Sequence, residues 1–284
     1  MPSVLALVFA VSLSGTLAAQ TSAADSQQLL QSSMSALQQG DLATAEAGFR
    51  KLSHTTPSSP ELHDLLGYTL MLEGRTVDAL PELRQATSLA PSLSPAVAHL
   101  AEALAQSGDL QAADAQFRRA LALGNAEPDT YIAYAHALSG LGKNADAEAQ
   151  LRRALQLEPE NAQAYDDLGS VLVQQKKGDE AIEAFKRAAQ LDPQLASARL
   201  HLGVLLLQEH QASAAISPLQ SAATLQPNNS LGHLYLGEAY REQRQFKEAV
   251  PELQRAVDLA PKNAEAYTQL GLALQTSGET ERGI

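Results

Sequence analysis

The sequence has no cysteine and no tryptophan, and aromatic residues make up only 4% of its 284 positions. Without cysteine the chain has no disulfide, no thiolate metal site and no cysteine nucleophile. With so few aromatics a large compact core would be hard to fill, whereas thin layers of Ala and Leu could pack closely. Valine and isoleucine are also sparse, which argues against a β-rich fold.

Basic residues are in deficit. Lys and Arg total 20 against 32 Asp and Glu, so the formal net charge is −12. Nucleic acids and anionic membranes both attract basic patches, and the charge balance therefore argues against either as a partner. An RNA-binding helical repeat is disfavoured for the same reason.

The N-terminal segment has no Lys or Arg before Arg50, and residues 4–19 form an apolar stretch that ends in small residues. The stretch is short and interrupted by Ser and Gly, which is typical of a secretory signal peptide rather than a membrane span. We expect a signal peptide at 1–19, with cleavage after Ala19 or, as second choice, after Ala24. Its first three residues carry no basic side chain, and a buried N-terminal helix is the alternative. Cleavage predicts a periplasmic or secreted protein without a stable membrane span.

A repeat of 34 residues runs through the rest of the chain. The repeat is marked by prolines, by a small residue ten positions later, and by an alanine in the second half of each unit. The prolines are Pro57, Pro91, Pro159, Pro193, Pro227 and Pro261; the small residues are Gly67, Ala101, Ala135, Gly169, Gly203, Gly237 and Gly271; the alanines are Ala45, Ala79, Ala113, Ala147, Ala181, Ala215 and Ala249.

This pattern resembles the tetratricopeptide repeat (TPR), and the resemblance covers about residues 26–284. It implies an all-α, right-handed α-solenoid of antiparallel helix hairpins, a TPR superhelix. The units it implies are 26–59, 60–93, 94–127, 128–161, 162–195, 196–229 and 230–263, followed by a partial eighth at 264–284. The family's first-helix aromatic is kept at Tyr131, Tyr165 and Tyr267 but is replaced at His63, Val97, Arg199 and His233, which should weaken packing there.

Helical physics leads to the same fold. Apolar residues recur at helical spacing within each unit, and a hairpin of two such helices buries its apolar faces only against its neighbours. Glycines 40, 74, 108, 142 and 278 stand where a first helix should end, and Asp41, Asp109 and Asp179 are expected to cap the second helices. Internal prolines at 81, 218 and 251 predict gentle bends or late helix starts.

The two ends of the array differ from its middle. Ser32 and Ser33 stand in slots that are apolar or small elsewhere, which indicates a polar N-terminal cap. The last expected helix, 264–276, keeps a full core pattern, so we expect either an adhesive edge there or a natural chain that continues beyond Ile284.

No catalytic motif is present. The seven histidines lack metal-ligand spacing, and no G-x-S-x-G, Walker or dinucleotide-binding loop occurs. His99 and His201 fall in equivalent slots of different units, which points to ordinary packing histidines. We therefore predict no catalytic residues, no cofactor and no metal.

The family resemblance implies a concave groove lined by fixed slots of the first helices. The groove so defined is acidic, is apolar around the sixth unit, and lacks the Lys, Asn and Arg with which some family members clamp a chaperone's carboxylate. We therefore expect a basic or apolar protein or peptide partner and no carboxylate clamp. The predicted partner-binding residues are Glu61, Asp64, Tyr68, Met71, Glu102, Asp129, Ile132, His136, Asp166, Ser170, Leu200, Val204, Leu207, Leu234, Glu238, Arg241 and Glu242.

Paired basic residues recur at one slot of the second helices, at 50–51, 118–119, 152–153 and 186–187. They predict a stripe on the outer face, which is either a solvated surface or a weak anion-binding strip.

These observations favour a non-catalytic interaction scaffold, exported, that binds protein or peptide partners in the groove. The alternative is a partner-binding segment of a larger enzyme, a transferase or peptidase, whose catalytic domain would lie beyond Ile284.

Overall fold

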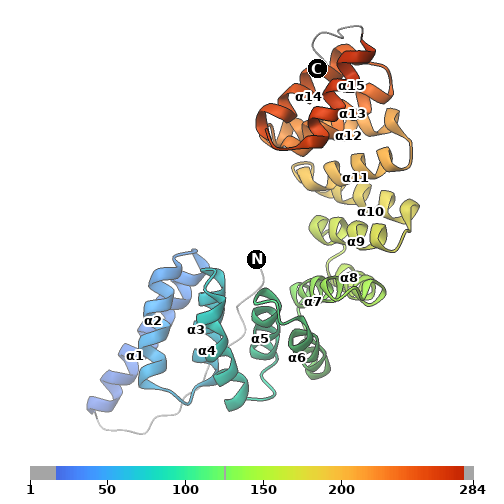
Figure 1. Ribbon diagram of the computed structural model, residues 1–284. Helices are drawn as coiled ribbons and strands as arrows, with labels where there is room; N and C mark the ends of the chain where they lie inside the picture. Colours follow the sequence, from blue (N-terminus) through green and yellow to red (C-terminus); the bar gives the residue numbers. More distant parts are fainter. Residues whose placement is uncertain (1–16, 125, 278–284) are drawn as a thin grey trace. The chain divides into compact units, whose positions relative to one another are not determined.

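The computed structural model describes residues 17–124 and 126–277, and within them it contains only α-helices and short turns (Figure 1). The predicted all-α fold of antiparallel hairpins is confirmed. The helices are α1 (Leu17–Gln38), α2 (Leu42–Thr55), α3 (Pro60–Leu72), α4 (Thr76–Leu89), α5 (Ser94–Gln106), α6 (Leu110–Leu123), α7 (Pro128–Gly140), α8 (Asn144–Leu157), α9 (Ala162–Gln174), α10 (Gly178–Leu191), α11 (Ala196–Gln208), α12 (Ala212–Leu225), α13 (Ser230–Glu242), α14 (Phe246–Leu259) and α15 (Ala264–Thr276). Most of the predicted signal peptide, residues 1–16, lies outside the described residues.

The chain divides into two compact units, and the division falls between Lys143 and Asn144. Unit 1 holds α1 to α7, and unit 2 holds α8 to α15. Every odd-numbered helix from α3 onward begins at the residue where a predicted repeat begins, from Pro60 to Ala264. The division therefore falls inside the predicted repeat 128–161, whose two helices belong to different units.

The turn between the two helices of a hairpin always uses a left-handed residue in the same repeat slot. Glycine fills it in unit 1, where Gly40, Gly74, Gly108 and Gly142 have φ between 72° and 88°. In unit 2 the slot holds Lys176, His210 and Arg244, with φ of 61°, 57° and 57°. These three residues adopt a left-handed backbone conformation, which costs an L-residue about 1–2 kcal/mol. Gly278 lies outside the described residues.

Side-chain caps begin several helices. Asp41 and Asp109 accept hydrogen bonds from the amides of Thr44 and Ala112, each at 3.2 Å, as predicted. The prediction for Asp179 is wrong, because α10 begins at Gly178 and its N-cap residue is Lys177. Asp179 therefore lies in the first turn of the helix, where its charge still complements the helix dipole.

The internal prolines do not delay their helices. α4, α12 and α14 contain Pro81, Pro218 and Pro251, yet they begin in the same repeat slot as the second helices that lack proline. The predicted late starts are therefore wrong. Each proline removes one backbone donor from the interior of its helix.

The core consists of alanine layers and of large side chains packed against small residues. All seven alanines of the repeat slot, from Ala45 to Ala249, are fully buried. A methyl group added to Gly169 would lie 2.5 Å from the ring of Phe185, and one added to Gly203 would lie 2.3 Å from Leu219. The glycines therefore let the two helices of a hairpin approach closely, as the repeat pattern predicts.

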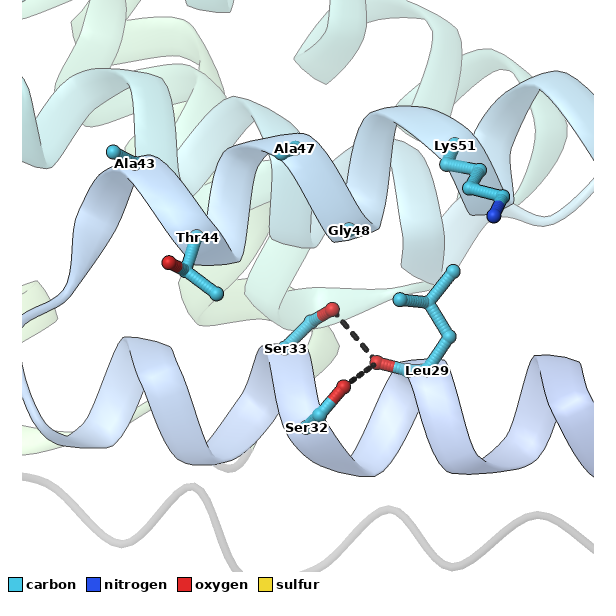
Figure 2. Close-up of a pocket in the computed structure, with 8 residues that line it drawn as sticks. All are labelled: Leu29, Ser32, Ser33, Ala43, Thr44, Ala47, Gly48 and Lys51. Carbon is cyan, nitrogen blue, oxygen red and sulfur yellow. Dashed lines mark hydrogen bonds between the residues drawn. The ribbon is translucent and has the colours of Figure 1, made fainter.

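In the first hairpin the glycine of the close contact lies on the second helix instead of the first (Figure 2). Ser33 of α1 occupies the slot of the small residue, and Gly48 of α2 lies opposite it, so close that an added methyl group would meet the serine hydroxyl. Ser33 is buried, and its hydroxyl donates to the Leu29 carbonyl at 2.7 Å. Ser32 donates to the same carbonyl at 2.9 Å but is exposed, so only part of the predicted polar cap faces solvent.

Hydrogen bonds replace the missing aromatic residue in two repeats. His63 contacts Glu82 at 2.6 Å through Nδ1 and the Pro57 carbonyl at 3.0 Å through Nε2. His233 makes the equivalent contacts with Glu252 and Pro227, at 2.6 and 3.1 Å. Val97 fills the same slot with no exposed surface. The expected weak packing is therefore not found at these positions.

Candidate partner-binding surfaces

The first helices of successive hairpins define one face in each unit. In unit 1, α3 contacts α5 and α5 contacts α7; in unit 2, α9, α11, α13 and α15 contact one another in order. Within the units, α2, α4, α6, α10, α12 and α14 each pack against the first helix of their own hairpin and that of the next one, and α8 packs against α9. We call the exposed surface of these first helices the inner face of each unit, and it is the surface on which the predicted partner-binding residues were placed.

A histidine–aspartate pair stands at the centre of the inner face of unit 1. Nδ1 of His99, on α5, lies 2.7 Å from Oδ1 of Asp64, on α3, and its ring stacks on Tyr68 with centroids 4.5 Å apart. The side chain of His99 is 23% exposed and that of Asp64 is 11% exposed. The pair therefore joins two successive repeats at a point that solvent still reaches.

Carboxylates surround this pair and repel one another. Burial raises the pKa of Glu102, the charge of His99 opposes this, and the charges of Asp129 and Asp64 raise the pKa further. Burial and the same acidic neighbours, Glu102 first, also raise the pKa of Tyr68. Burial alone would lower the pKa of His99, but Asp64 and Glu102 together raise it to about 8. Unit 1 thus holds one cationic histidine among three carboxylates on α3, α5 and α7.

Unit 2 contains the same pair three repeats later. Nδ1 of His201, on α11, lies 2.8 Å from Oδ1 of Asp166, on α9, and the ring of His201 tilts against Phe185 at 5.4 Å. The hydrogen bond that His201 donates to Asp166 raises the pKa of His201 despite partial burial. Asp166 itself is only 2% exposed, so it positions the histidine rather than facing a partner.

A second acidic surface lies on α13 and α15 of unit 2. Nε of Arg241 donates to Gln269 at 2.8 Å, and Gln269 in turn donates to Glu238 at 3.4 Å. Burial raises the pKa of Glu238, and Glu242 and Glu265 raise it further against the opposing charge of Arg241. The one arginine among the predicted partner-binding residues is thus held by side chains of its own unit.

The predicted residues differ in how far they reach the surface. Leu234 is wrong as a contact residue, because it has no exposed surface and belongs to the core formed with Leu253 and Leu270. Met71 and Leu207 retain only 7% and 8% exposure. Asp129, His136 and Glu242 are exposed; Glu61, Tyr68, Glu102, Ile132, Ser170, Leu200, Val204, Glu238 and Arg241 are partly exposed.

Sequence analysis missed three residues of the inner face of unit 2. Leu231 and Leu272 are each 43% exposed, and Glu265 is exposed as well. Leu231 and Glu265 share their repeat slot with the predicted Glu61, and Leu272 shares the slot of Glu238. Extending the slot rule to every repeat would have found them.

Three residues of the outer basic stripe, Arg50, Arg118 and Arg152, take part in ion pairs within the chain, and we call the whole set of pairs the ion-pair ladder. Three acids on second helices each contact a base one helical turn later and another base 29 residues later, at the start of the next second helix. Glu148 lies 2.8 Å from Arg152 and 2.7 Å from Lys177. The other two sets are Glu46 with Arg50 and Arg75, and Asp114 with Arg118 and Lys143.

The carboxylates of the ladder are mostly buried and strongly held. Burial would raise the pKa of Glu148, but hydrogen bonds from Lys177, Arg152 and Gln175 lower it to about 2. The pKa of Asp114 is also lowered, because Lys143 and the Tyr134 hydroxyl outweigh its burial. Arg75, Lys143 and Lys177 therefore join successive repeats, whereas Arg50, Arg118 and Arg152 each pair with a carboxylate of their own helix. These pairs weaken the support for an anion-binding strip at positions 50, 118 and 152.

A shallow hollow between α1 and α2 is lined by small and polar side chains, among them Ala43, Thr44 and Lys51 (Figure 2). Within 17–124 and 126–277, no three His, Asp or Glu residues are grouped so that they could hold a metal ion. In the same ranges no helix is both long and apolar enough to cross a bilayer.

Stacked hairpins with an open inner face define a helical-repeat scaffold of the kind that binds other proteins. Tetratricopeptide repeat models match residues 133–196 and 172–234, and a TPR repeat model matches 237–278. The chain belongs to the tetratricopeptide repeat family. No curated protein matches the sequence.

Solved structures of low sequence identity share the fold. The APC/C hetero-tetramer Cut9–Hcn1 matches with a TM-score of 0.65 at 19% identity, over 82% of this chain and 48% of that one. Pseudomonas aeruginosa pilF matches with a TM-score of 0.65 at 24% identity, over 78% and 97%. YrrB, described as a TPR protein with an unusual peptide-binding site, matches with a TM-score of 0.55 at 22% identity, over 65% and 95%. The chain spans about half the length of the Cut9–Hcn1 chain that it matches.

Proposed function

We propose that the protein is an exported, non-catalytic scaffold that binds protein or peptide partners on the inner faces of its two units. The tetratricopeptide fold is that of a protein–protein interaction scaffold. Export is supported by the apolar residues 4–19 and the small residues that follow them. YrrB, which shares the fold, is described as having a peptide-binding site, and this supports a peptide or an extended segment as the ligand.

The partner of unit 1 carries a basic segment. The observation that carries this proposal is the gathering of Asp64, Glu102 and Asp129 on three successive first helices. Burial raises the pKa of Glu102, the charge of His99 opposes this, and Asp129 and Asp64 raise the pKa further. A Lys or Arg side chain placed beside these carboxylates would relieve their repulsion, and complementary charge would also speed association. In unit 2, the partly exposed Leu200 and Val204 favour an apolar contact instead.

A peptide library displayed on phage tests the proposal at pH 7. We expect enrichment of peptides with two or more Lys or Arg residues, and the Glu102→Gln/Asp129→Asn variant should bind them at least fivefold more weakly. Glu183→Gln is the matched control, because Glu183 lies on α10 outside the inner face and is highly exposed. Enrichment of acidic peptides, or equal binding by the double variant and the control, would contradict the proposal.

Export is tested separately by sequencing the N-terminus of the protein recovered from the periplasm or medium of a bacterial host. Cleavage at the preferred site gives Gln20 as the first residue, and cleavage at the second gives Asp25. Recovery of intact chain from the cytoplasm alone would remove export from the proposal.

A further inference from the structure

His99 lies among the acidic residues of the inner face of unit 1, and its side chain is partly exposed. It contacts Asp64 on α3, stacks on Tyr68 and shares α5 with Glu102. Because of this exposure, a proton can exchange with solvent. We propose that His99 regulates this surface: it weakens the binding of a basic segment while it carries a proton, and it strengthens binding when the proton leaves. The inference rests on the proposed function.

The geometry allows the charge to change without a change of structure. Nδ1 of His99 faces the Asp64 carboxylate, and a proton on Nδ1 satisfies this contact in both the charged and the neutral ring. The proton that leaves is therefore the one on Nε2. Because the hydrogen bond between α3 and α5 survives, the inner face loses one positive charge while the two helices stay in contact.

The surrounding charges give the sign of the effect. Among the described residues, Asp64 on α3 and Glu102 on α5, the helix of His99, raise the pKa of His99. Asp129 on α7 raises the pKa of Glu102. These carboxylates hold the pKa of His99 at about 8, so at neutral pH the ring is mostly charged and competes with a partner's cation. Above pH 8 the three carboxylates face the partner without this internal counter-charge. By reciprocity, binding of a basic segment must release a proton from His99.

The test measures binding of a tetramethylrhodamine-labelled octa-arginine peptide to the full chain between pH 6.5 and 9.5 by fluorescence anisotropy. Arginine stays charged over this range, so the probe does not titrate. We expect the affinity of the wild type to rise about three- to tenfold between pH 7 and 9, the effect of removing one nearby charge at a partly exposed site. His99→Gln should bind with nearly constant affinity, close to the wild-type value at pH 9.

Two variants locate the effect. His54→Gln, which changes an exposed histidine on α2, should keep the full pH dependence of the wild type. Glu102→Gln should weaken binding at every pH, and its failure to do so would overturn the assignment of the surface. The inference is also overturned if His99→Gln retains the rise in affinity, or if wild-type binding is independent of pH. Absence of octa-arginine binding at any pH would instead reject the basic partner of the proposed function, and the regulation with it.

Discussion

At the scale of single residues, the two units differ in the residue type that fills the left-handed position of each turn. Unit 1 fills it with glycine, whereas unit 2 fills it with Lys176, His210 and Arg244 at φ near 60°. No hydrogen bond of these three side chains is found among the described interactions that would offset the cost of this conformation. In unit 2 these residues therefore adopt a backbone conformation that is unfavourable for their side chains.

Arg244→Gly should stabilise unit 2. The substitution removes a left-handed cost of about 1–2 kcal/mol, and the extra freedom of glycine in the unfolded chain returns part of it, so we expect a net gain of about 0.5–1 kcal/mol. Urea unfolding followed by circular dichroism measures the change. Gly108→Lys makes the reverse exchange in unit 1 and should lower stability by a similar amount. A loss of stability in Arg244→Gly would show that the arginine makes a compensating contact.

At the scale of helices, the ion-pair ladder connects each second helix to the start of the next. Glu148 is 13% exposed, and three donors hold its pKa at about 2, below its ordinary value of 4.5. A carboxyl whose pKa is lowered by folding stabilises the folded state above its unfolded pKa. That stability disappears as the pH falls from about 4.5 toward 2.

Glu148→Gln should therefore destabilise the protein at pH 7 by about 1–2 kcal/mol, less than the full shift implies because Arg152 and Lys177 are partly solvated. At pH 3 somewhat more than half of this difference should be gone, because the contribution of the wild-type carboxyl falls between its unfolded and folded pKa values. Urea unfolding at the two pH values measures it. Glu183→Gln, whose side chain is 74% exposed, is the control and should change little at either pH. An equal loss at pH 7 and pH 3 would show that packing rather than charge is at work.

The sequence predicted the helices better than the contacts between them. Proline, glycine and alanine slots determine where α3 to α15 begin and which side chains are buried, because backbone geometry and helix spacing act locally. The pairing of Asp64 with His99 was not predicted, because it joins two different helices and, among the residues that the structure describes, recurs only in the pair Asp166–His201. Nor was the burial of Leu234, which depends on how large its neighbours Leu253 and Leu270 are.

The ladder could have been predicted from the sequence alone. Wherever the slot of Glu148 is acidic, the residue 29 positions later is basic; where it is Leu80, Ile182 or Ile216, that residue is Asp109, Gln211 or Gln245. This covariation lies between repeats of one chain and needs no relatives. An alignment that compares the repeats position by position does not reveal it, because the two partners belong to different repeats.

At the scale of the whole molecule, stability should spread only between neighbouring hairpins. In a stack of repeats each hairpin contacts only those beside it, so damage at one site is felt locally. Leu219 of α12 has no exposed surface and fills the space above Gly203 of α11. Leu219→Ala should cost about 2–4 kcal/mol in local stability.

Hydrogen exchange measures how far this effect reaches. We expect faster exchange in α11, α12 and α13 of the Leu219→Ala variant, with much smaller changes in α8 and in unit 1. Leu272→Ala, at a position that is 43% exposed, is the control and should leave exchange nearly unchanged. A uniform acceleration over the whole chain would mean that the units unfold as one cooperative body.

The ion-pair ladder has a consequence for how such an array can grow. Genes for repeats lengthen by copying and reinserting a segment, and a repeat with an acid in the ladder slot needs a follower with a cation 29 positions on. If the segment with Glu148 were copied in front of one that supplies Gln211 or Asp109, its carboxylate would keep Arg152 but lose the counter-ion that the next repeat provides. The hairpins of this protein therefore have similar shapes but cannot be exchanged freely in order. To extend the array, a designer would have to copy a repeat with an acid in the ladder slot together with the repeat that supplies its base.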